Sequence, residues 1–303
     1  MIDLADKSDS MAWASAAASD RLSNRQNASA PRLWAMFGLI LLIAGFANQA
    51  RAEVEVDVEL VLAVDVSRSM TDRELQIQRR GYAEALRSDA VAAAIKNGLL
   101  GKIALTYVEW GGQFWQRTVV DWRIIEDEQD LAVFAERITA SFDGSLRRTS
   151  ISSAIDDAAR RIEENEFSGL RQVIDISGDG PNNDGAPATG ARDRALAKGI
   201  VINGLPLMTR EGMGARFHLD DLDDYYRYCV IGGPGSFVIP VTKWEEFPEA
   251  VRRKLVLELA GTYDAAVHKA AFSGATEGGY DCMIGEKIWR RFIDQNGIFE
   301  VNP

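Results

Sequence analysis

Histidine and cysteine are scarce in this sequence, with two residues of each among 303. A serine or cysteine nucleophile commonly works with a nearby histidine base, so the sequence leaves little room for that kind of catalysis. No apolar run reaches the roughly 18 residues that a membrane-spanning helix needs. Basic residues number 34 against 45 acidic ones, for a net charge of −11. This deficit of positive charge argues against nucleic acid as a partner and against a polybasic membrane patch.

Residues 1–52 differ in composition from the rest of the chain. The segment 1–30 is rich in Ala, Ser and Asp and has no helical pattern long enough to build a core. Arg32 then precedes an apolar stretch over 33–47, and the small residues Ala50 and Ala52 follow, with one residue between them. Positive charge, apolar stretch and small residues in this order are typical of a secretory signal, so we expect cleavage after residue 52.

This signal predicts export, to the periplasm or out of the cell, and it divides the chain into three parts. Residues 1–52 are an extension with the signal, 53–261 form one domain, and 262–303 form a tail packed on that domain. Two alternatives stay open. Translation could start further in, at Met11, or the stretch 33–47 could remain uncleaved as an inner-membrane anchor.

Cys229 and Cys282 allow one intramolecular disulfide. An oxidising compartment permits it, and closing a loop of this length stabilises a fold by about 4 kcal/mol on the chain-entropy account. The alternative is a pair of buried thiols. The export signal favours the disulfide.

Short β-branched runs alternate with amphipathic stretches from residue 54 onward. This alternation predicts a doubly wound, Rossmann-like α/β domain: a mostly parallel sheet with helices on both faces and one antiparallel edge strand. The expected strands are 57–65, 101–110, 114–125, 171–177, 200–207 and 236–241, and the expected helices are 71–88, 128–141, 151–164, 188–199, 221–233 and 244–261.

Oxygen-bearing side chains gather at the edge of the predicted sheet where ligands of such folds bind, beyond the carboxyl ends of the strands. Hard oxygen donors with few carboxylates suit Mg²⁺ or Mn²⁺ with bound waters, rather than zinc or copper. An ion held this way keeps positive charge and attracts an external acidic group. The candidates are Asp65, Ser67 and Ser69 after the first strand, Thr149 and Ser150 before the helix at 151–164, and Asp179, Asn182, Asn183 and Asp184 after the strand at 171–177.

The pattern D-x-S-x-S at 65–69, directly after an apolar strand, resembles the metal-ion-dependent adhesion site (MIDAS) of von Willebrand factor A (vWA) domains. Thr149 and Asp179 stand where that family has its threonine and its second aspartate. The resemblance covers about residues 56–261. As a whole, the chain also resembles a bacterial family of uncharacterised exported vWA-like proteins.

The resemblance implies a role for each residue of the motif. Ser67 and Ser69 would contact Mg²⁺ or Mn²⁺ directly, and Thr149 would bind the ion directly or through water. Asp65 and Asp179 would act mostly through bound waters. One open coordination position would take a Glu or Asp of a protein partner, and no catalytic residue is implied.

Two features depart from the family pattern. Arg147 and Arg148 precede Thr149, where the family usually has small residues. Gly178 stands directly before Asp179, where the family usually has a hydroxyl-bearing residue. The arginines could weaken metal binding or could guide an acidic ligand, and the sequence leaves both alternatives open.

Each part of the motif also has a simpler structural interpretation. Thr71 with Glu74 has the pattern of a capping box, Thr149 could cap the helix that follows it, and Asp179 could belong to an ordinary turn. A cap at Thr71 explains one hydroxyl, however, and not the alternating residues at 65–69. The order of all three parts along the chain favours the metal site.

The predicted function is therefore a non-enzymatic, exported domain that binds a protein through a divalent cation. The alternatives are a vWA-like scaffold without metal and, less favoured, a serine- or metal-dependent hydrolase. A hydrolase is less favoured because the G-x-S-x-G elbow is absent and because His218 and His268 are distant in sequence from the motif.

Two further sequence features weakly suggest binding sites, and each has a simpler structural interpretation. His218 near the aspartates at 220–224 suggests a second metal site, but the acidic start of a helix explains the cluster. Aromatic side chains around the predicted edge hairpin could form a binding face, but we expect them to pack against the sheet under a helix. These residues are Trp110, Phe114, Trp115 and Trp122.

Overall fold

The sheet has five strands, and its order places the first strand in the middle, β3-β2-β1-β4-β5. The structure, a computed structural model, describes residues 53–140, 144–209, 218–260 and 279–296, all in one compact unit. The expected signal at 33–47 and much of the expected tail lie outside the described residues. The strands are β1 (Val54–Asp65), β2 (Ile103–Trp110), β3 (Gln116–Ile125), β4 (Phe167–Gly178) and β5 (Val201–Pro206).

Strand pairing confirms the predicted fold class. β1 pairs in parallel with β2 and β4, β5 pairs in parallel with β4, and β3 alone is antiparallel, on β2. Every residue of β1 from Val56 to Asp65 is buried. A central parallel strand is covered on both faces, which is why β1 is continuously apolar over residues 60–64. The parallel strands therefore end together, at one edge of the sheet.

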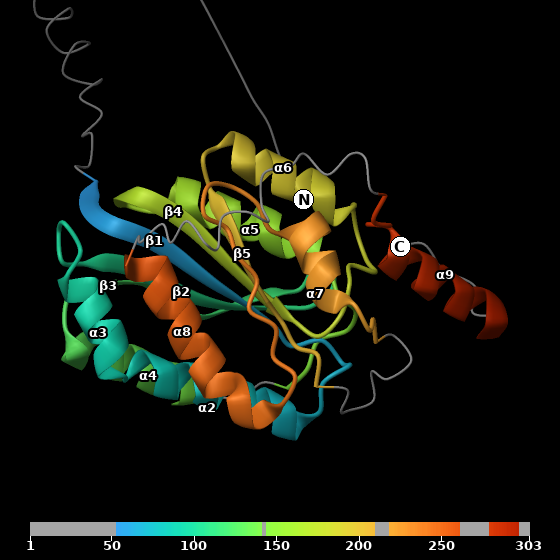
Figure 1. Ribbon diagram of the computed structural model, residues 1–303, viewed down its shortest axis with the longest axis horizontal. Helices are drawn as coiled ribbons and strands as arrows, with labels where there is room; N and C mark the ends of the chain where they lie inside the picture. The colour runs from blue at the N-terminus through green and yellow to red at the C-terminus, as the bar shows by residue number, and fades with distance from the viewer. Residues whose placement is uncertain (1–52, 141–143, 210–217, 261–278, 297–303) are drawn as a thin grey trace, which may run out of the picture. The chain divides into compact units, whose positions relative to one another are not determined.

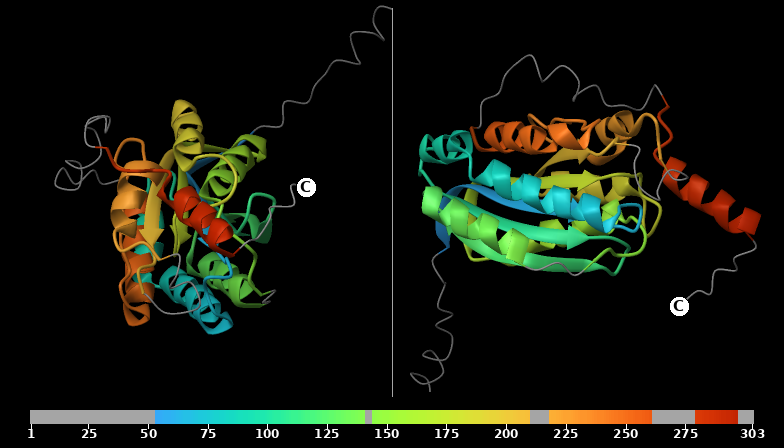
Figure 2. Two further views of the ribbon diagram at one scale, coloured as in Figure 1. Left: turned by 90° about the vertical axis from the view of Figure 1, so that its right-hand side faces the viewer. Right: turned by 90° about the horizontal axis from the view of Figure 1, so that it is seen from below.

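Helices cover both faces of this sheet, each over its own apolar core (Figure 1). One face carries α2, α3, α4 and α8, and the other carries α5, α6 and α7; Figure 2 shows the same layers from two more sides. Among the described residues no helix is long and apolar enough to cross a membrane. The helices are α2 (Asp72–Leu86), α3 (Asp89–Lys96), α4 (Glu128–Ala140), α5 (Ile151–Glu164), α6 (Ala188–Ala197), α7 (Leu222–Tyr225), a π-helix (Tyr226–Val230), a 3₁₀ turn (Trp244–Glu246), α8 (Phe247–Ala260) and α9 (Ile284–Asn296).

Two predicted elements are wrong in detail, and two helices, α3 and α9, were not among the expected ranges. The segment 236–241 is not a strand: Val238 and Val241 form only isolated β-bridges within the described chain. Pro240 between them has no amide hydrogen to donate to a ladder. The helix expected at 221–233 is a short α-helix followed by a π-helix that ends at Val230. The additional helix α3 is short and follows α2 closely, so the periodicity of the sequence did not separate the two.

The capping box at the start of α2 is confirmed. The Glu74 amide donates to the Thr71 hydroxyl, and the Thr71 amide donates to the Glu74 carboxylate over 2.7 Å. The cap thus begins α2 one turn after the D-x-S-x-S segment, and it leaves the two serines free of capping.

Thr71→Ala is expected to lower the free energy of unfolding by about 1 kcal/mol, because it leaves helix-end amides without an acceptor. Urea unfolding of both proteins measures this difference. Thr71→Ser keeps the hydroxyl and is the matched control, expected to stay within a few tenths of a kcal/mol of the wild type. An equal loss in both variants would show that the methyl group, and not the cap, stabilises this turn.

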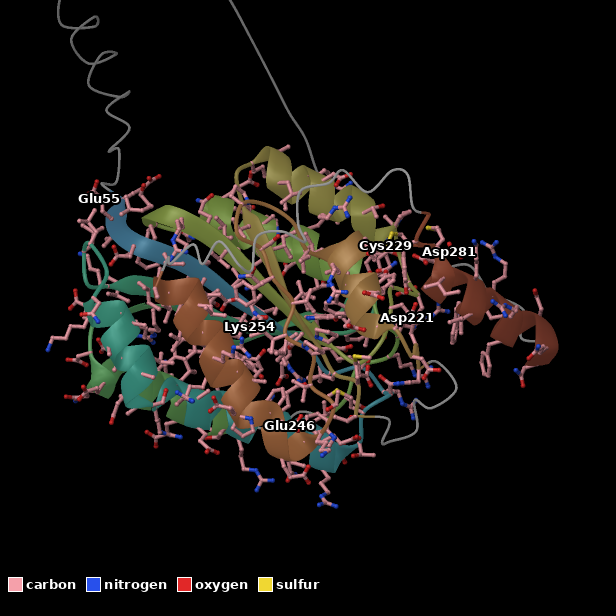
Figure 3. All side chains as sticks on the ribbon, viewed as in Figure 1. Glu55, Asp221, Cys229, Glu246, Lys254 and Asp281 are labelled. Atoms are coloured by element: carbon pink, nitrogen blue, oxygen red, sulfur yellow. A yellow bond between two sulfur atoms is a disulfide. The ribbon has the colours of Figure 1, made fainter. Side chains whose placement is uncertain are left out.

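A buried charged cluster joins α8 to β4 around Lys254, which Figure 3 labels. Lys254 is fully buried, and its Nζ lies 2.7 Å from Glu258 Oε1 and forms an ion pair with Asp175 of β4. The Asn203 amide donates to Glu258 over 3.0 Å. Burial raises the pKa of Asp175 to about 7, against the opposing effect of the Lys254 charge. The Lys254 ammonium group thus forms ion pairs with two buried carboxylates.

Candidate functional site

Four of the five predicted metal-site residues form one hydrogen-bonded group at the carboxyl edge of the sheet. The Ser67 amide donates to Asp65 Oδ1 over 2.7 Å. The hydroxyls of Ser67 and Ser69 lie 2.8 Å apart, and Ser69 donates to Asp179 Oδ1 over 2.7 Å. Because β1 and β4 are parallel neighbours, residues 110 positions apart meet beyond their ends.

The Asp65 carboxylate is buried and incompletely satisfied. Its exposed fraction is 0%, and its Oδ2 has no hydrogen-bond partner among the described residues. Burial, and then the charge of Asp179, raise the pKa of Asp65 well above its usual range. Burial also raises the pKa of Asp179 to about 6, while the hydrogen bond from Ser69 opposes the rise. Two carboxyl groups held together without a cation are electrostatically unfavourable.

Gly178 is explained by the crowding around Asp65. A Cβ at position 178 would lie 2.9 Å from Asp65 Oδ2 and 2.9 Å from the Tyr226 hydroxyl. Such distances are too short for a side chain, so only glycine lets β4 pass this close to the carboxylate. The departure from the family pattern at this position therefore accommodates Tyr226, which is buried in the apolar core shared with α5 and α6.

Thr149 reaches the same edge on a neighbouring loop. The segment before it pairs with the D-x-S-x-S segment through a β-bridge between Leu146 and Ser67. The Thr149 amide donates to the Asn183 side chain over 3.1 Å, and the Thr149 carbonyl accepts from the Asn183 amide over 2.9 Å. Thr149 is 4% exposed. The structure thus places all three motif segments side by side, with Thr149 joined to the Asp179 loop through Asn183.

Arg148 adopts a strained backbone conformation directly before Thr149. Its φ is +64°, in a region that glycine adopts freely and other residues adopt at a cost. Its guanidinium lies 3.1 Å from Asp184 and stacks 4.6 Å from the centre of the Trp289 ring of α9. These contacts explain why an arginine stands where the family usually has a small residue: its side chain ties the Thr149 loop to two other segments.

The predicted disulfide between Cys229 and Cys282 is present, with the two Cα atoms 5.5 Å apart. It joins the π-helix to the segment before α9; Figure 3 shows Cys229 and Asp281 on the same side of the molecule. The Asn182 side chain donates to Glu286 of α9 over 2.7 Å. The described segment 279–296 is therefore held beside the loop that carries Asp179.

Sequence reasoning missed two polar residues close to Asp65. Gln78 donates from its side chain to the Asp65 carbonyl over 2.9 Å. The Tyr226 hydroxyl is buried near the Asp65 carboxylate, and this charge, after burial, raises the pKa of Tyr226. A signal for Gln78 existed: it lies four residues after Glu74, on the inner face of α2. Nothing in the sequence indicated Tyr226, because the π-helix that places it was not predictable.

The chemistry of the group fits a hard divalent cation. It offers two carboxylates and the hydroxyls of Ser67 and Ser69, and one oxygen of the buried Asp65 carboxylate has no hydrogen-bond partner among the described residues. In those same residues no three His, Cys, Asp or Glu side chains are grouped to hold a metal, so a site here would depend on hydroxyls, as a MIDAS does. The described residues near His218 also form no group of three metal-ligating side chains, so the second metal site is not supported. Asp223 and Asp224 in that segment form ion pairs with Arg227 instead.

The profile of DUF1194, "Protein of unknown function", matches residues 55–263. The chain belongs to the DUF1194 family. This match covers the sheet, its helices and all three motif segments, and it agrees with the predicted resemblance to uncharacterised vWA-like proteins. No curated protein matches the chain.

Several solved structures are similar to this DUF1194 protein at low identity. Proximal thread matrix protein 1 from the mussel byssus, with a zinc-occupied MIDAS motif, is 17% identical with a TM-score of 0.45; the match covers 69% of this chain and 49% of the mussel protein. This chain therefore spans about half of that protein. BatB from Bacteroides thetaiotaomicron is 20% identical (TM-score 0.43; 68% and 100% covered). A von Willebrand factor type A protein from Catenulispora acidiphila is 15% identical (TM-score 0.44; 67% and 42% covered).

Proposed function

We propose that this DUF1194 protein is a non-enzymatic domain that binds Mg²⁺ or Mn²⁺ and, through the ion, an acidic side chain of a protein partner. The residues that would hold the ion are Asp65, Ser67, Ser69, Thr149 and Asp179. The observation that carries the proposal is the buried Oδ2 of Asp65, which has no partner in the described chain and belongs to the hydrogen-bonded group of serines and Asp179.

A cation in this group would satisfy the unpaired carboxylate oxygen and offset the repulsion between Asp65 and Asp179. The site has only two carboxylates, so a bound divalent ion keeps an affinity for an external carboxylate. The same scarcity of carboxylates disfavours a two-metal hydrolytic centre. Binding, and not turnover, is what these side chains support.

The proposed place of action is outside the cytoplasm, in the periplasm or beyond the cell. The stretch 33–47 supports export, and the disulfide between Cys229 and Cys282 is of a kind that persists in oxidising compartments. We propose no nucleic-acid partner, and a membrane attachment only through 33–47 if the signal stays uncleaved.

Calorimetric titration of the full chain with Mg²⁺ and with Mn²⁺ is expected to show binding that EDTA reverses. Ser67→Ala should weaken it by about 10–100-fold, because the variant loses an oxygen at the centre of the group. Ser168→Ala, at an exposed serine near the start of β4, is the matched control and should bind as the wild type does. Absence of binding by the wild type would leave the metal-free scaffold as the better interpretation. Esterase or phosphatase turnover that Ser69→Ala abolishes would overturn the non-enzymatic part.

A further inference from the structure

Two exposed arginines flank the candidate metal site. Arg68 lies between Ser67 and Ser69, and Arg147 follows Leu146, which forms a β-bridge with Ser67. Within the described ranges neither arginine forms an ion pair or a side-chain hydrogen bond. The chain carries a net charge of −11, so acidic partners are abundant elsewhere on it. The described part of the fold therefore holds neither arginine in an ion pair, although both lie beside the carboxylates of the candidate site.

Two exposed aromatic side chains lie on the loop next to these arginines. Phe114 and Trp115 are 77% and 58% exposed, which corrects the expectation that they pack under a helix. Both belong to the loop between β2 and β3. Their loop packs on the Arg147 segment: a Cβ on Gly112 would lie 2.8 Å from the Arg147 carbonyl oxygen. The Trp115 amide donates to Gly112, which fixes the loop.

We propose that Arg68, Arg147, Phe114 and Trp115 form the partner-contact surface around the ion, here called the rim. The partner it fits is a protein segment with at least two carboxylates and an adjacent apolar side chain. One carboxylate would bind the ion, a second would pair with Arg68 or Arg147, and the apolar side chain would pack on Trp115 and Phe114. This inference rests on the proposed function of the site.

The rim differs from the ion in what it contributes to recognition. A single carboxylate on a cation selects only for charge, whereas paired arginines select for a second acidic group at a set spacing. Exposed Trp and Arg side chains are also the types that carry most binding energy in protein interfaces. The rim therefore gives the site specificity for a class of acidic segments with an apolar neighbour.

The test is selection of random linear peptides, displayed on phage, on the full chain with excess Mg²⁺. Peptides with two or more acidic residues next to an aromatic or aliphatic residue are the expected result. A selected peptide is then titrated on the variants. Arg68→Ala combined with Arg147→Ala should weaken it at least tenfold and reduce its salt dependence, and Trp115→Ala should weaken it about tenfold. Arg87→Ala combined with Arg123→Ala is the control for the double arginine variant, and Leu99→Ala is the control for Trp115→Ala. All three control positions are exposed and lie away from the rim.

Mg²⁺ titration of the same variants separates this inference from the proposed function. Loss of two positive charges should tighten Mg²⁺ binding by the double arginine variant while its peptide binding falls. If the wild type binds Mg²⁺ but the selected peptides lack paired acids, or bind the double variant equally well, the rim is wrong and the metal site stands. Failure to select any peptide on the Mg²⁺-bound protein counts against the rim as well. If the wild type binds no Mg²⁺, the proposed function fails, whatever the peptides show.

Discussion

Asp65→Asn is expected to abolish stabilisation by Mg²⁺ while leaving the metal-free protein at least as stable as the wild type. The asparagine keeps the shape of the side chain and an oxygen that can accept from the Ser67 amide. It removes a buried negative charge whose Oδ2 has no partner in the described chain and which faces Asp179. The charge that destabilises the metal-free fold is thus the one that attracts the ion.

The size of the effect follows from linkage. A ligand at 100 times its dissociation constant stabilises the folded state by about 2.7 kcal/mol, which is roughly 5–10 °C in Tm for a domain of this size. Asp65→Asn should lose this whole increment. Thermal melts with Mg²⁺ and with EDTA measure it for both proteins.

Asp121→Asn is the matched control, since it removes one negative charge from an exposed position on the edge strand β3. It should keep the full response to Mg²⁺. A persisting Mg²⁺ response in Asp65→Asn would show that the ion binds elsewhere. A marked loss of stability in the metal-free variant would show that the Asp65 carboxylate has a stabilising partner in the fold itself.

Lys254→Met should destabilise the fold by about 3–5 kcal/mol near neutral pH, because it removes the cation that serves two buried carboxylates. Lys254 has an exposed fraction of 0% and pairs with Asp175 and Glu258. Urea unfolding against pH measures the loss. Lys198→Met, at an exposed lysine paired with Glu163, is the matched control and should change stability by less than about 1 kcal/mol.

The pH dependence of this cluster has a definite sign. The pKa of Asp175 is raised from 3.8 to about 7 in the folded protein, chiefly by burial. Between these values the folded state binds more protons than the unfolded state, so stability falls as pH rises from about 4 to about 7. Removal of Lys254 takes away the charge that lowers this pKa, so the deficit of Lys254→Met should be small near pH 5 and grow toward pH 8. Asp175→Asn in the Lys254→Met background should recover part of the loss at high pH. A deficit independent of pH would instead indicate lost packing of the lysine stem.

The sequence by itself determined the sheet and most of its helices. The apolar run at 60–64 identified β1, and Val173, Ile174 and Ile176 identified β4, because a strand covered on both faces is rich in apolar residues on both. The spacing of Ile151, Ile155 and Ile162 identified α5, and Thr71 with Glu74 located the start of α2. These signals are local in the sequence, and the tertiary packing is consistent with them. Residue types beyond the strand ends and before the helix at 151–164 gave a wider set of oxygen donors, and the resemblance to vWA domains selected the five residues of the candidate metal site from it.

Only the tertiary structure decided what surrounds that site. The burial of Asp65, the close approach of Gly178 to Tyr226, and the link from Thr149 to Asn183 depend on segments that meet across the edge of the sheet. The strained Arg148 is held by contacts with Asp184 and Trp289, which no local pattern encodes. Exposure of Phe114 and Trp115 was decided in the same way, since an aromatic residue in a turn is covered or left open only by what packs beside it. The chemical type of each residue is given by the sequence, whereas its burial and electrostatic environment depend on segments that are distant in the chain and meet only in the folded structure.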